Sequence, residues 1–160
     1  MAAQPDAQRR LVLHGAVILL VGLLCGYPSI IEEANRSGRM WQAAHSALLM
    51  LGVWLIASAA VLPLLDLPRR ERDALLLSIT GGAYSFMTAV VIQAATGVRA
   101  VSPDVSGISL VAFVANLLAV LGTILAASLT VMGAWNALRT SRREPAAESI
   151  DATRSVEPGV

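Results

Sequence analysis

The sequence predicts an all-α integral membrane protein, a bundle of four transmembrane helices. Of its 160 residues, 56% are hydrophobic and 14% are charged, against roughly 25% charged residues in an ordinary soluble domain. Four long stretches of the chain contain no Asp, Glu, Lys or Arg. This composition excludes a soluble globular enzyme. The net charge of +1 offers no positive surface to a polyanion, so we expect no nucleic-acid partner.

Each apolar stretch is long enough to cross a bilayer, which takes about 20 residues of α-helix. The predicted spans are residues 11–31, 41–65, 74–97 and 108–138. Because lipid offers no hydrogen-bond partners, each span has to satisfy its backbone internally, and an α-helix does so. The last span is longer than a bilayer requires, so we expect it to tilt or to extend into the cytoplasm.

Arginine residues predict the orientation of the spans, because positively charged flanks stay in the cytoplasm. The N-terminal flank, the second loop and the C-terminal flank together carry Arg9, Arg10, Arg69, Arg70, Arg72, Arg139, Arg142 and Arg143. The first and third loops carry only Arg36, Arg39 and Arg99. Both termini are therefore predicted to be cytoplasmic. Residues 144–160 contain Pro, Glu and Ser without periodicity, which predicts a disordered cytoplasmic tail.

Small residues spaced four apart predict close packing of helices, within or between subunits, because they let two backbones approach each other. The pairs are Gly22 and Gly26, Gly81 and Ser85, and Gly122 and Ala126. This spacing is common in membrane helices, so it predicts a compact bundle and no particular chemistry.

Only two ionisable side chains lie within the spans, His14 and His45. Because burying such groups costs free energy, both are candidates for function. His14 lies about one turn inside the cytoplasmic end of its span, and His45 about one turn inside the outer end of its own. At 1.5 Å per residue we expect them on the order of 20 Å apart, too far to share one metal or one haem. Tyr84, in the cytoplasmic half, can bond His14 or a backbone carbonyl.

The neighbours of His45 predict a cavity in the outer half of the bundle. Trp41 lies one turn away on the same helical face, and Gly52 leaves room there for a bulky planar group. Polar side chains at matching depth on the other helices, which we predict as catalytic, are Tyr27, Gln93 and Asn116. A neutral imidazole pointing into this cavity can ligate haem iron and leave the opposite axial position open.

Other interpretations remain open at this stage. His45, Gln93 and Asn116 can simply hydrogen-bond across helices, and Trp41 can belong to the interfacial aromatic belt. No carboxylate lies within the spans, which disfavours a proton-coupled transporter. The alternatives to an enzyme are a non-catalytic membrane anchor, a haem-binding electron-transfer subunit, or a small uptake or efflux protein for apolar compounds.

The sequence resembles the styrene oxide isomerase family over most of residues 8–143. The most specific similarity is the W-x-x-A-H-S pattern, Trp41 to Ser46, at the start of the second span. The resemblance also includes His14-Gly15, Val61-Leu62-Pro63 and Ala137-Leu138-Arg139-Thr140-Ser141-Arg142. Bacterial hydroxylaminobenzene mutases are similar at Asn35, Arg39-Met40, Ala44-His45, Gly82-Ala83-Tyr84 and Ala94 to Gly97. Proteins of both families have four membrane helices and rearrange an oxygen function within one small aromatic substrate.

The first resemblance implies a trimer in the bacterial inner membrane with haem b at its subunit interfaces. His45 would be the axial ligand, beside Trp41 and Gly52 in the cofactor site. The ferric iron would act as a Lewis acid on an epoxide oxygen, opening the C–O bond toward a benzylic cation, and a hydride shift would give the aldehyde. Such a metal polarises an oxygen without net redox chemistry.

The sequence departs from the family pattern at three positions that line its pocket. The family's Asn two turns past the histidine falls at Leu51, and its third-helix Asp and Tyr fall near Ala83 and Val91. These departures leave the haem site in place. They imply either a different substrate or a relative without the isomerase activity.

Overall fold

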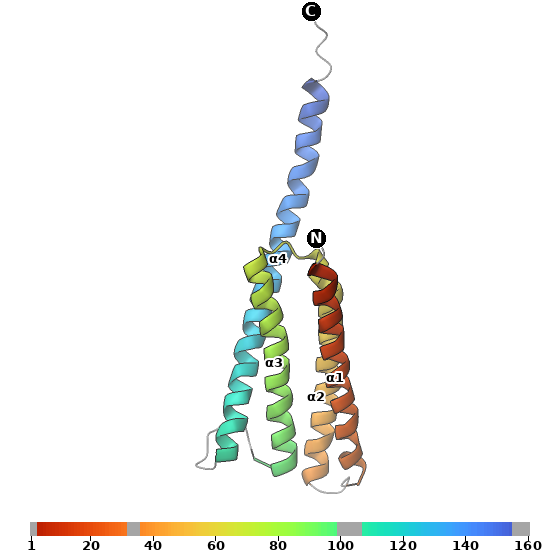
Figure 1. The fold of residues 1–160 in the computed structure, drawn as a ribbon, viewed down its shortest axis with the longest axis vertical. Coiled ribbons are helices and arrows are strands. Elements are labelled where there is room, and N and C mark those ends of the chain that lie inside the picture. The colour runs from red at the N-terminus through yellow and green to blue at the C-terminus, as the bar shows by residue number, and fades with distance from the viewer. Residues whose placement is uncertain (1–2, 32–35, 99–106, 155–160) are drawn as a thin grey trace, which may run out of the picture.

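The computed structural model confirms the all-α, four-helix class predicted from the sequence. It describes the backbone of residues 3–31, 36–98 and 107–154, with side chains over 6–31, 37–98 and 107–141. The elements are α1 (Ala3–Ile31), α2 (Arg36–Val61), a short 3-10 helix η1 (Leu62–Leu64), α3 (Arg69–Thr96) and α4 (Gly107–Arg154). The four long helices run side by side along one axis (Figure 1).

Each predicted span overlaps one helix, and every long helix begins before its apolar stretch. The second span was predicted to reach residue 65, but α2 ends at Val61 and η1 follows it, with Pro63 inside. Backbone hydrogen bonds continue into the polar flanks, so α1 begins at Ala3 and α3 at Arg69. α3 ends at Thr96 and is capped by Gly97, whose φ of 71° is a left-handed conformation that suits glycine. α4 is helical as far as Arg154, past the start of the predicted tail. The backbone of residues 144–154 is thus helical, and disorder stays a prediction for residues 155–160, which lie outside the described residues.

α1 and α2 form the first antiparallel hairpin, and glycines bring their backbones together. A Cβ atom added at Gly52 would lie 2.8 Å from the carbonyl oxygen of Gly15, and the reciprocal distance from Gly15 is also 2.8 Å. Closer to the other end of the hairpin, a Cβ at Gly22 would lie 3.1 Å from both the Leu48 Cβ and the Leu49 amide nitrogen. Larger residues at these positions would push the two helices apart.

α3 and α4 form the second hairpin, again through glycines. A Cβ at Gly122 would lie 3.0 Å from the Gly82 Cα and 3.0 Å from the Ser78 carbonyl oxygen. Within one chain Gly81 makes no such contact, because no neighbouring helix or side chain lies within 4 Å of a Cβ built there, and its packing between subunits stays a prediction. Gly81 and Gly82 point about 100° apart around the helix, and only Gly82 faces α4.

The two hairpins are joined at the end where the N-terminus lies. The turn between α2 and α3 crosses α4 at Gly133, whose carbonyl oxygen accepts the Asp66 backbone N–H at 3.2 Å. A Cβ at Gly133 would lie only 2.8 Å from the Leu67 Cγ. Thr140 adds a hydrogen bond from its hydroxyl to the Asp66 carboxylate at 3.3 Å. These contacts hold the connecting turn against α4.

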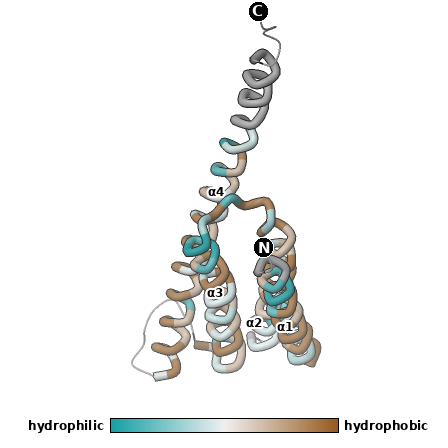
Figure 2. The backbone as a smooth tube through the Cα atoms, turned by 45° about the horizontal axis from the view of Figure 1, so that its top comes forward, coloured by the Kyte–Doolittle hydropathy of each residue, from teal (hydrophilic) through white to brown (hydrophobic). Residues whose placement is uncertain are grey.

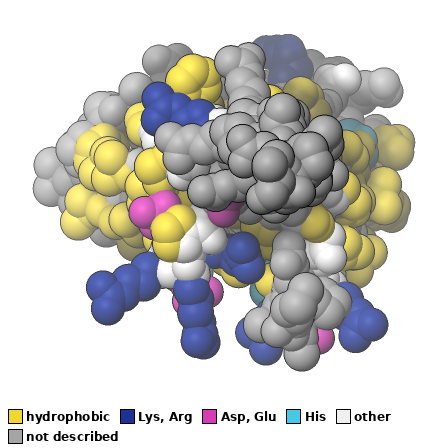
Figure 3. Space-filling model, turned by 90° about the horizontal axis from the view of Figure 1, so that it is seen from above, with side chains coloured by type: hydrophobic (Ala, Val, Ile, Leu, Met, Phe, Trp, Pro, Cys, Tyr) yellow, Lys and Arg dark blue, Asp and Glu magenta, His cyan; other side chains and the backbone are white. Residues whose placement is uncertain are grey.

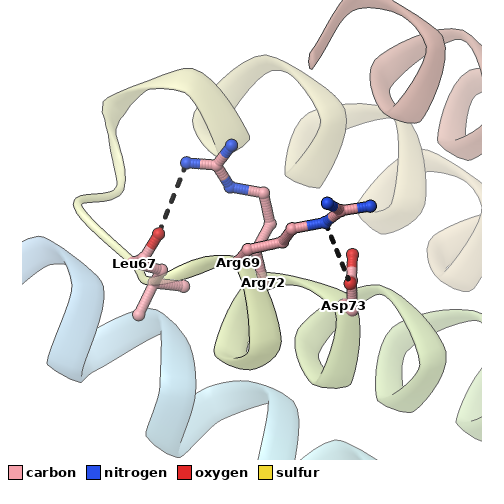
Figure 4. A network of polar contacts seen from close by, with 4 residues as sticks. All are labelled: Leu67, Arg69, Arg72 and Asp73. Atoms are coloured by element: carbon pink, nitrogen blue, oxygen red, sulfur yellow. Dashed lines mark hydrogen bonds and ion pairs between the residues drawn. The ribbon is translucent and has the colours of Figure 1, made fainter. Parts of the chain in front are cut away.

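Charged residues gather at this same end of the bundle. Figure 2 shows hydrophobic residues along the four helices and hydrophilic residues at the start of α3, and Arg side chains project there in the view from above (Figure 3). Arg72 donates to the Leu67 carbonyl oxygen at 3.4 Å, while Arg69 lies 4.0 Å from the Asp73 carboxylate (Figure 4). Exposed pairs of this kind contribute little stability, about 0–1 kcal/mol.

The outer faces of the helices are apolar. All four described helices are long and apolar enough to cross a membrane. Exposed large hydrophobic side chains occur on every one of them, among them Leu24, Val53, Leu77 and Val131. In water such a surface would be an aggregation site, whereas in lipid it is the expected exterior. The chain is therefore a multi-pass membrane protein.

We predict that Gly122→Leu separates α3 from α4, because its side chain has no space against Gly82 and Ser78. We expect a loss of about 1–3 kcal/mol in the free energy of unfolding, as for other overpacked interiors. The measurement is unfolding by SDS in mixed micelles. Gly81→Leu is the matched control and should leave the midpoint unchanged. Equal destabilisation by both substitutions would contradict the observed packing.

Candidate functional site

His45 is the candidate site residue whose surroundings the structure defines best. It lies on α2, and its half-buried side chain points toward α1. The Nδ1 atom of the ring is 2.8 Å from the backbone carbonyl oxygen of Gly22. Gly26, one turn further along α1, flanks the ring, since a Cβ there would lie 2.9 Å from Nδ1 and 3.1 Å from Cε1. The imidazole therefore fills the space that a side chain at Gly26 would take.

The bond to Gly22 determines which ring nitrogen of His45 is available. A carbonyl oxygen can only accept a hydrogen bond, so Nδ1 has to carry the hydrogen. In the neutral imidazole Nε2 then holds an unshared electron pair. Metal-binding histidines commonly have this arrangement, in which one nitrogen donates to a carbonyl or carboxylate and the other coordinates the metal. The site thus presents one nitrogen ligand.

Trp41 and Gly52 lie on the α1-facing side of α2 with His45. Trp41 is half-buried and packs against the apolar core. Gly52 is buried against α1, where a Cβ would lie 2.5 Å from the Leu19 Cγ. Within one chain, Leu19 and the Gly15 backbone therefore fill the space that the sequence analysis assigned to a planar group. Cofactor binding by Trp41 and Gly52 stays a prediction.

The three polar side chains predicted as catalytic lie on three different helices. Tyr27 is 69% exposed on α1. Gln93 is half-buried on α3, and Asn116 is half-buried on α4. α1 packs mainly on α2, and α4 packs mainly on α3, so Tyr27 and Asn116 belong to different hairpins. Their catalytic roles stay predictions.

His14 forms a second polar site, separate from His45. Its Nδ1 atom is 2.9 Å from the Tyr84 hydroxyl oxygen, and the two rings meet edge to face with centroids 5.5 Å apart. Tyr84 was one of the partners that the sequence analysis considered for His14. Gly22 lies eight residues further along α1 than His14, about 12 Å at 1.5 Å per residue. The two histidines therefore occupy different levels of the bundle.

An apolar groove between α2, α3 and α4 was not anticipated from the sequence. It consists of two adjoining cavities of about 420 Å³ each, which share Trp54 and Ile79. The cavity nearer to His45 is also lined by Met50, Leu51 and Phe86. Apolar positions on membrane helices do not reveal from sequence whether they face lipid, a neighbouring helix or a groove.

His45 and this groove lie on opposite faces of α2. At about 100° per residue, Met50 and Trp54 are displaced from His45 by about 140° and 180° around the helix. Leu51 and Ala83, two of the positions at which the resemblance implies a departure from the family, both line the groove. Among the described side chains, no three His, Cys, Asp or Glu residues lie together as a metal site.

The fold and these residues define a class of protein, the small four-helix membrane proteins that carry an oriented intramembrane histidine. A profile of the styrene oxide isomerase family matches residues 7–137. The chain belongs to this family, which indicates an isomerase-like function. The matched region includes His14, His45 and Tyr84. No curated protein and no solved structure matches the chain significantly.

We predict that the bond between His14 and Tyr84 couples α1 to α3. In a double-mutant cycle of His14→Ala and Tyr84→Phe, we expect a coupling free energy of about 0.6 kcal/mol, with an upper bound near 1.7 kcal/mol. Unfolding in mixed micelles measures it. The control cycle combines Tyr84→Phe with His45→Ala and should be additive, because these residues share no contact. Coupling in the control alone would argue against the observed pairing.

Proposed function

We propose that this protein is a haem-dependent membrane isomerase that rearranges an oxygen function in a small aromatic substrate. Membership of the styrene oxide isomerase family supports an isomerase. The observation that carries the haem assignment is the hydrogen bond between His45 Nδ1 and the Gly22 carbonyl. This bond leaves Nε2 of His45 free to coordinate iron.

A single histidine is the right number of protein ligands for this chemistry. His45 would be the one side chain of this chain that holds the iron, and the porphyrin would supply the remaining protein-independent nitrogen ligands. When bound, haem b supplies a ferric Lewis acid that polarises the substrate oxygen without net redox chemistry. His14 bonds Tyr84 at another level of the bundle, so one chain would offer the iron a single histidine, His45. An electron-transfer haem usually has two protein ligands.

The chain itself contributes orientation and exclusion of water. Gly22 holds the His45 ring in place, and the side chains beside it are apolar, including the fully buried Leu48. An epoxide that opens toward a benzylic cation would be captured by water in an open site. A dry site within the membrane favours rearrangement over hydrolysis.

The apolar groove supports a small aromatic substrate without strong polar anchors. A cavity of about 420 Å³ is within the size range of small-molecule sites. Its lining includes Trp54 and Phe86, which suit an aromatic ring. Leu51 and Ala83 stand where the family pattern has Asn and Asp, so the amide and the carboxylate at those positions are missing here. We infer a more apolar substrate than the family's epoxide.

An oligomer would bring the two parts of the site together. In one chain His45 and the groove lie on opposite faces of α2, so a substrate in the groove does not meet Nε2 of the same chain. We propose a homo-oligomer, a trimer as the family resemblance implies, in which the α1–α2 hairpin of one copy, at the level of His45, adjoins the groove of another.

For the orientation, we propose that both termini face the cytoplasm of a bacterial inner membrane. Arg9 and Arg10 belong to the start of α1, and Arg69, Arg70 and Arg72 to the start of α3. Both helices start at the end of the bundle where the N-terminus lies (Figure 1), and the excess of Arg is expected to keep that end in the cytoplasm. The His45 site then lies in the outer half of the membrane.

We predict that the detergent-purified protein shows a haem Soret band and that His45→Ala loses it. Turnover of an aryl epoxide or an arylhydroxylamine should need no reductant. In His45→Ala the turnover rate should fall at least about 100-fold, to the rate of protein that has no haem bound. His14→Ala is the control and should keep the band. Absence of a band in the unaltered protein, with haem supplied during expression, would refute haem binding. A low-spin spectrum with two histidine ligands would favour electron transfer instead.

We also predict which exposed positions a membrane-impermeant maleimide reaches in intact bacterial cells. In a Cys25→Ala background, Arg39→Cys should be labelled from outside, whereas Arg70→Cys should be labelled only after lysis. The reason is the excess of Arg at the end that carries Arg70. The reverse pattern would show that the N-terminus faces the periplasm.

A further inference from the structure

The hydrogen bond of His45 depends on a backbone carbonyl oxygen within a helix. The second lone pair of such an oxygen usually lies under a neighbouring side chain of the same helix. In an α-helix the carbonyl oxygen of residue i already accepts the N–H of residue i+4, and one lone pair remains. The side chain at i+4 lies next to that lone pair. In this protein several hydroxyl groups occupy it, as in the bonds from Ser58 to Trp54, Thr80 to Leu76, Thr88 to Tyr84 and Thr123 to Ala119.

At Gly22 the residue four positions further along is Gly26, which has no side chain. The second lone pair of the Gly22 oxygen is therefore open toward α2, and His45 Nδ1 reaches it at 2.8 Å. A Cβ at Gly26 would lie 2.9 Å from that same nitrogen. The ring and a side chain at position 26 exclude each other.

We propose that Gly26 is the positioning residue of His45. Its missing side chain exposes the Gly22 carbonyl, and the resulting hydrogen bond sets both the orientation of the ring and its tautomer. The proposal deepens the proposed function. Only one part of it, the role of Nε2 as an iron ligand, rests on that function. The pair of glycines in α1 therefore serves the chemistry of the site as well as helix packing.

The nature of the acceptor has a chemical consequence. A backbone carbonyl is neutral, so it orients the imidazole without drawing away the Nδ1 proton as a carboxylate tends to do. A neutral imidazole donates less electron density to a metal than an imidazolate does. Groups that hydrogen-bond to a metal-ligating residue tune a bound metal in this way. The Gly22 carbonyl thus suits a ferric ion that has to accept electron density from a substrate oxygen.

The tautomer can be measured without haem. The chain has only two histidines, so ¹⁵N-histidine labelling of the haem-free protein gives two imidazoles, which His14→Ala and His45→Ala assign. In the unaltered protein we expect His45 with hydrogen on Nδ1 and a lone pair on Nε2. Gly26→Ala should abolish this preference and leave the signals of His14 unchanged. Gly81→Ala is the matched control, because a Cβ there meets no atom within 4 Å.

The same variants test the consequence for the cofactor. In Gly26→Ala we expect haem affinity to fall about 10- to 100-fold, as when other metal ligands lose their hydrogen-bond partners. Gly81→Ala should bind haem normally. An Nε2–H tautomer of His45 in the unaltered protein would overturn the proposal, and this measurement requires no variant to fold. An unchanged His45 tautomer in Gly26→Ala would also overturn it. If the tautomer results hold but no haem binds, the positioning role stands and the haem function fails.

Discussion

Inside a bilayer a polar group has no water to bond, so it has to find its partner within the protein. This constraint shapes every level of the structure. The backbone forms four helices, and hydroxyl groups on α2, α3 and α4 return to the carbonyl oxygens of their own helices. Both intramembrane histidines have partners on a neighbouring helix. Among the described residues, no buried side-chain nitrogen or oxygen lacks a hydrogen-bond partner.

Close approach of the helices makes the long-range bonds possible. Glycines at Gly15, Gly22 and Gly52 bring α1 and α2 together, and this proximity lets the His45 ring reach a carbonyl on the neighbouring helix. Gly82 and Gly122 serve the same purpose in the second hairpin. Because the hairpins meet mainly along α2 and α3, an apolar groove remains between α2, α3 and α4. Packing and chemistry thus depend on the same small residues.

The site combines a family feature with local departures. The W-x-x-A-H-S pattern and the profile match agree on the family, and His45 is held as a ligand would be. Leu51 and Ala83, where the family pattern has polar residues, both line the groove. The cavity nearer to His45 is lined mainly by aromatic and aliphatic side chains, with Ser78 and Thr123 as its hydroxyl groups.

The sequence by itself determined the class, the number of helices and the two histidines, because long uncharged stretches and rare intramembrane polar residues are visible without any contact being known. It also indicated Tyr84 as a partner for His14. Only the tertiary structure decided that Gly82 and not Gly81 meets α4, that Gly52 packs on α1, and that Tyr27 and Asn116 lie on separate hairpins. It alone showed that Gly26 exposes a carbonyl to His45. These features depend on the rotation of each helix about its axis and on its register against its neighbour, and apolar composition constrains neither when lipid and protein interior are equally apolar.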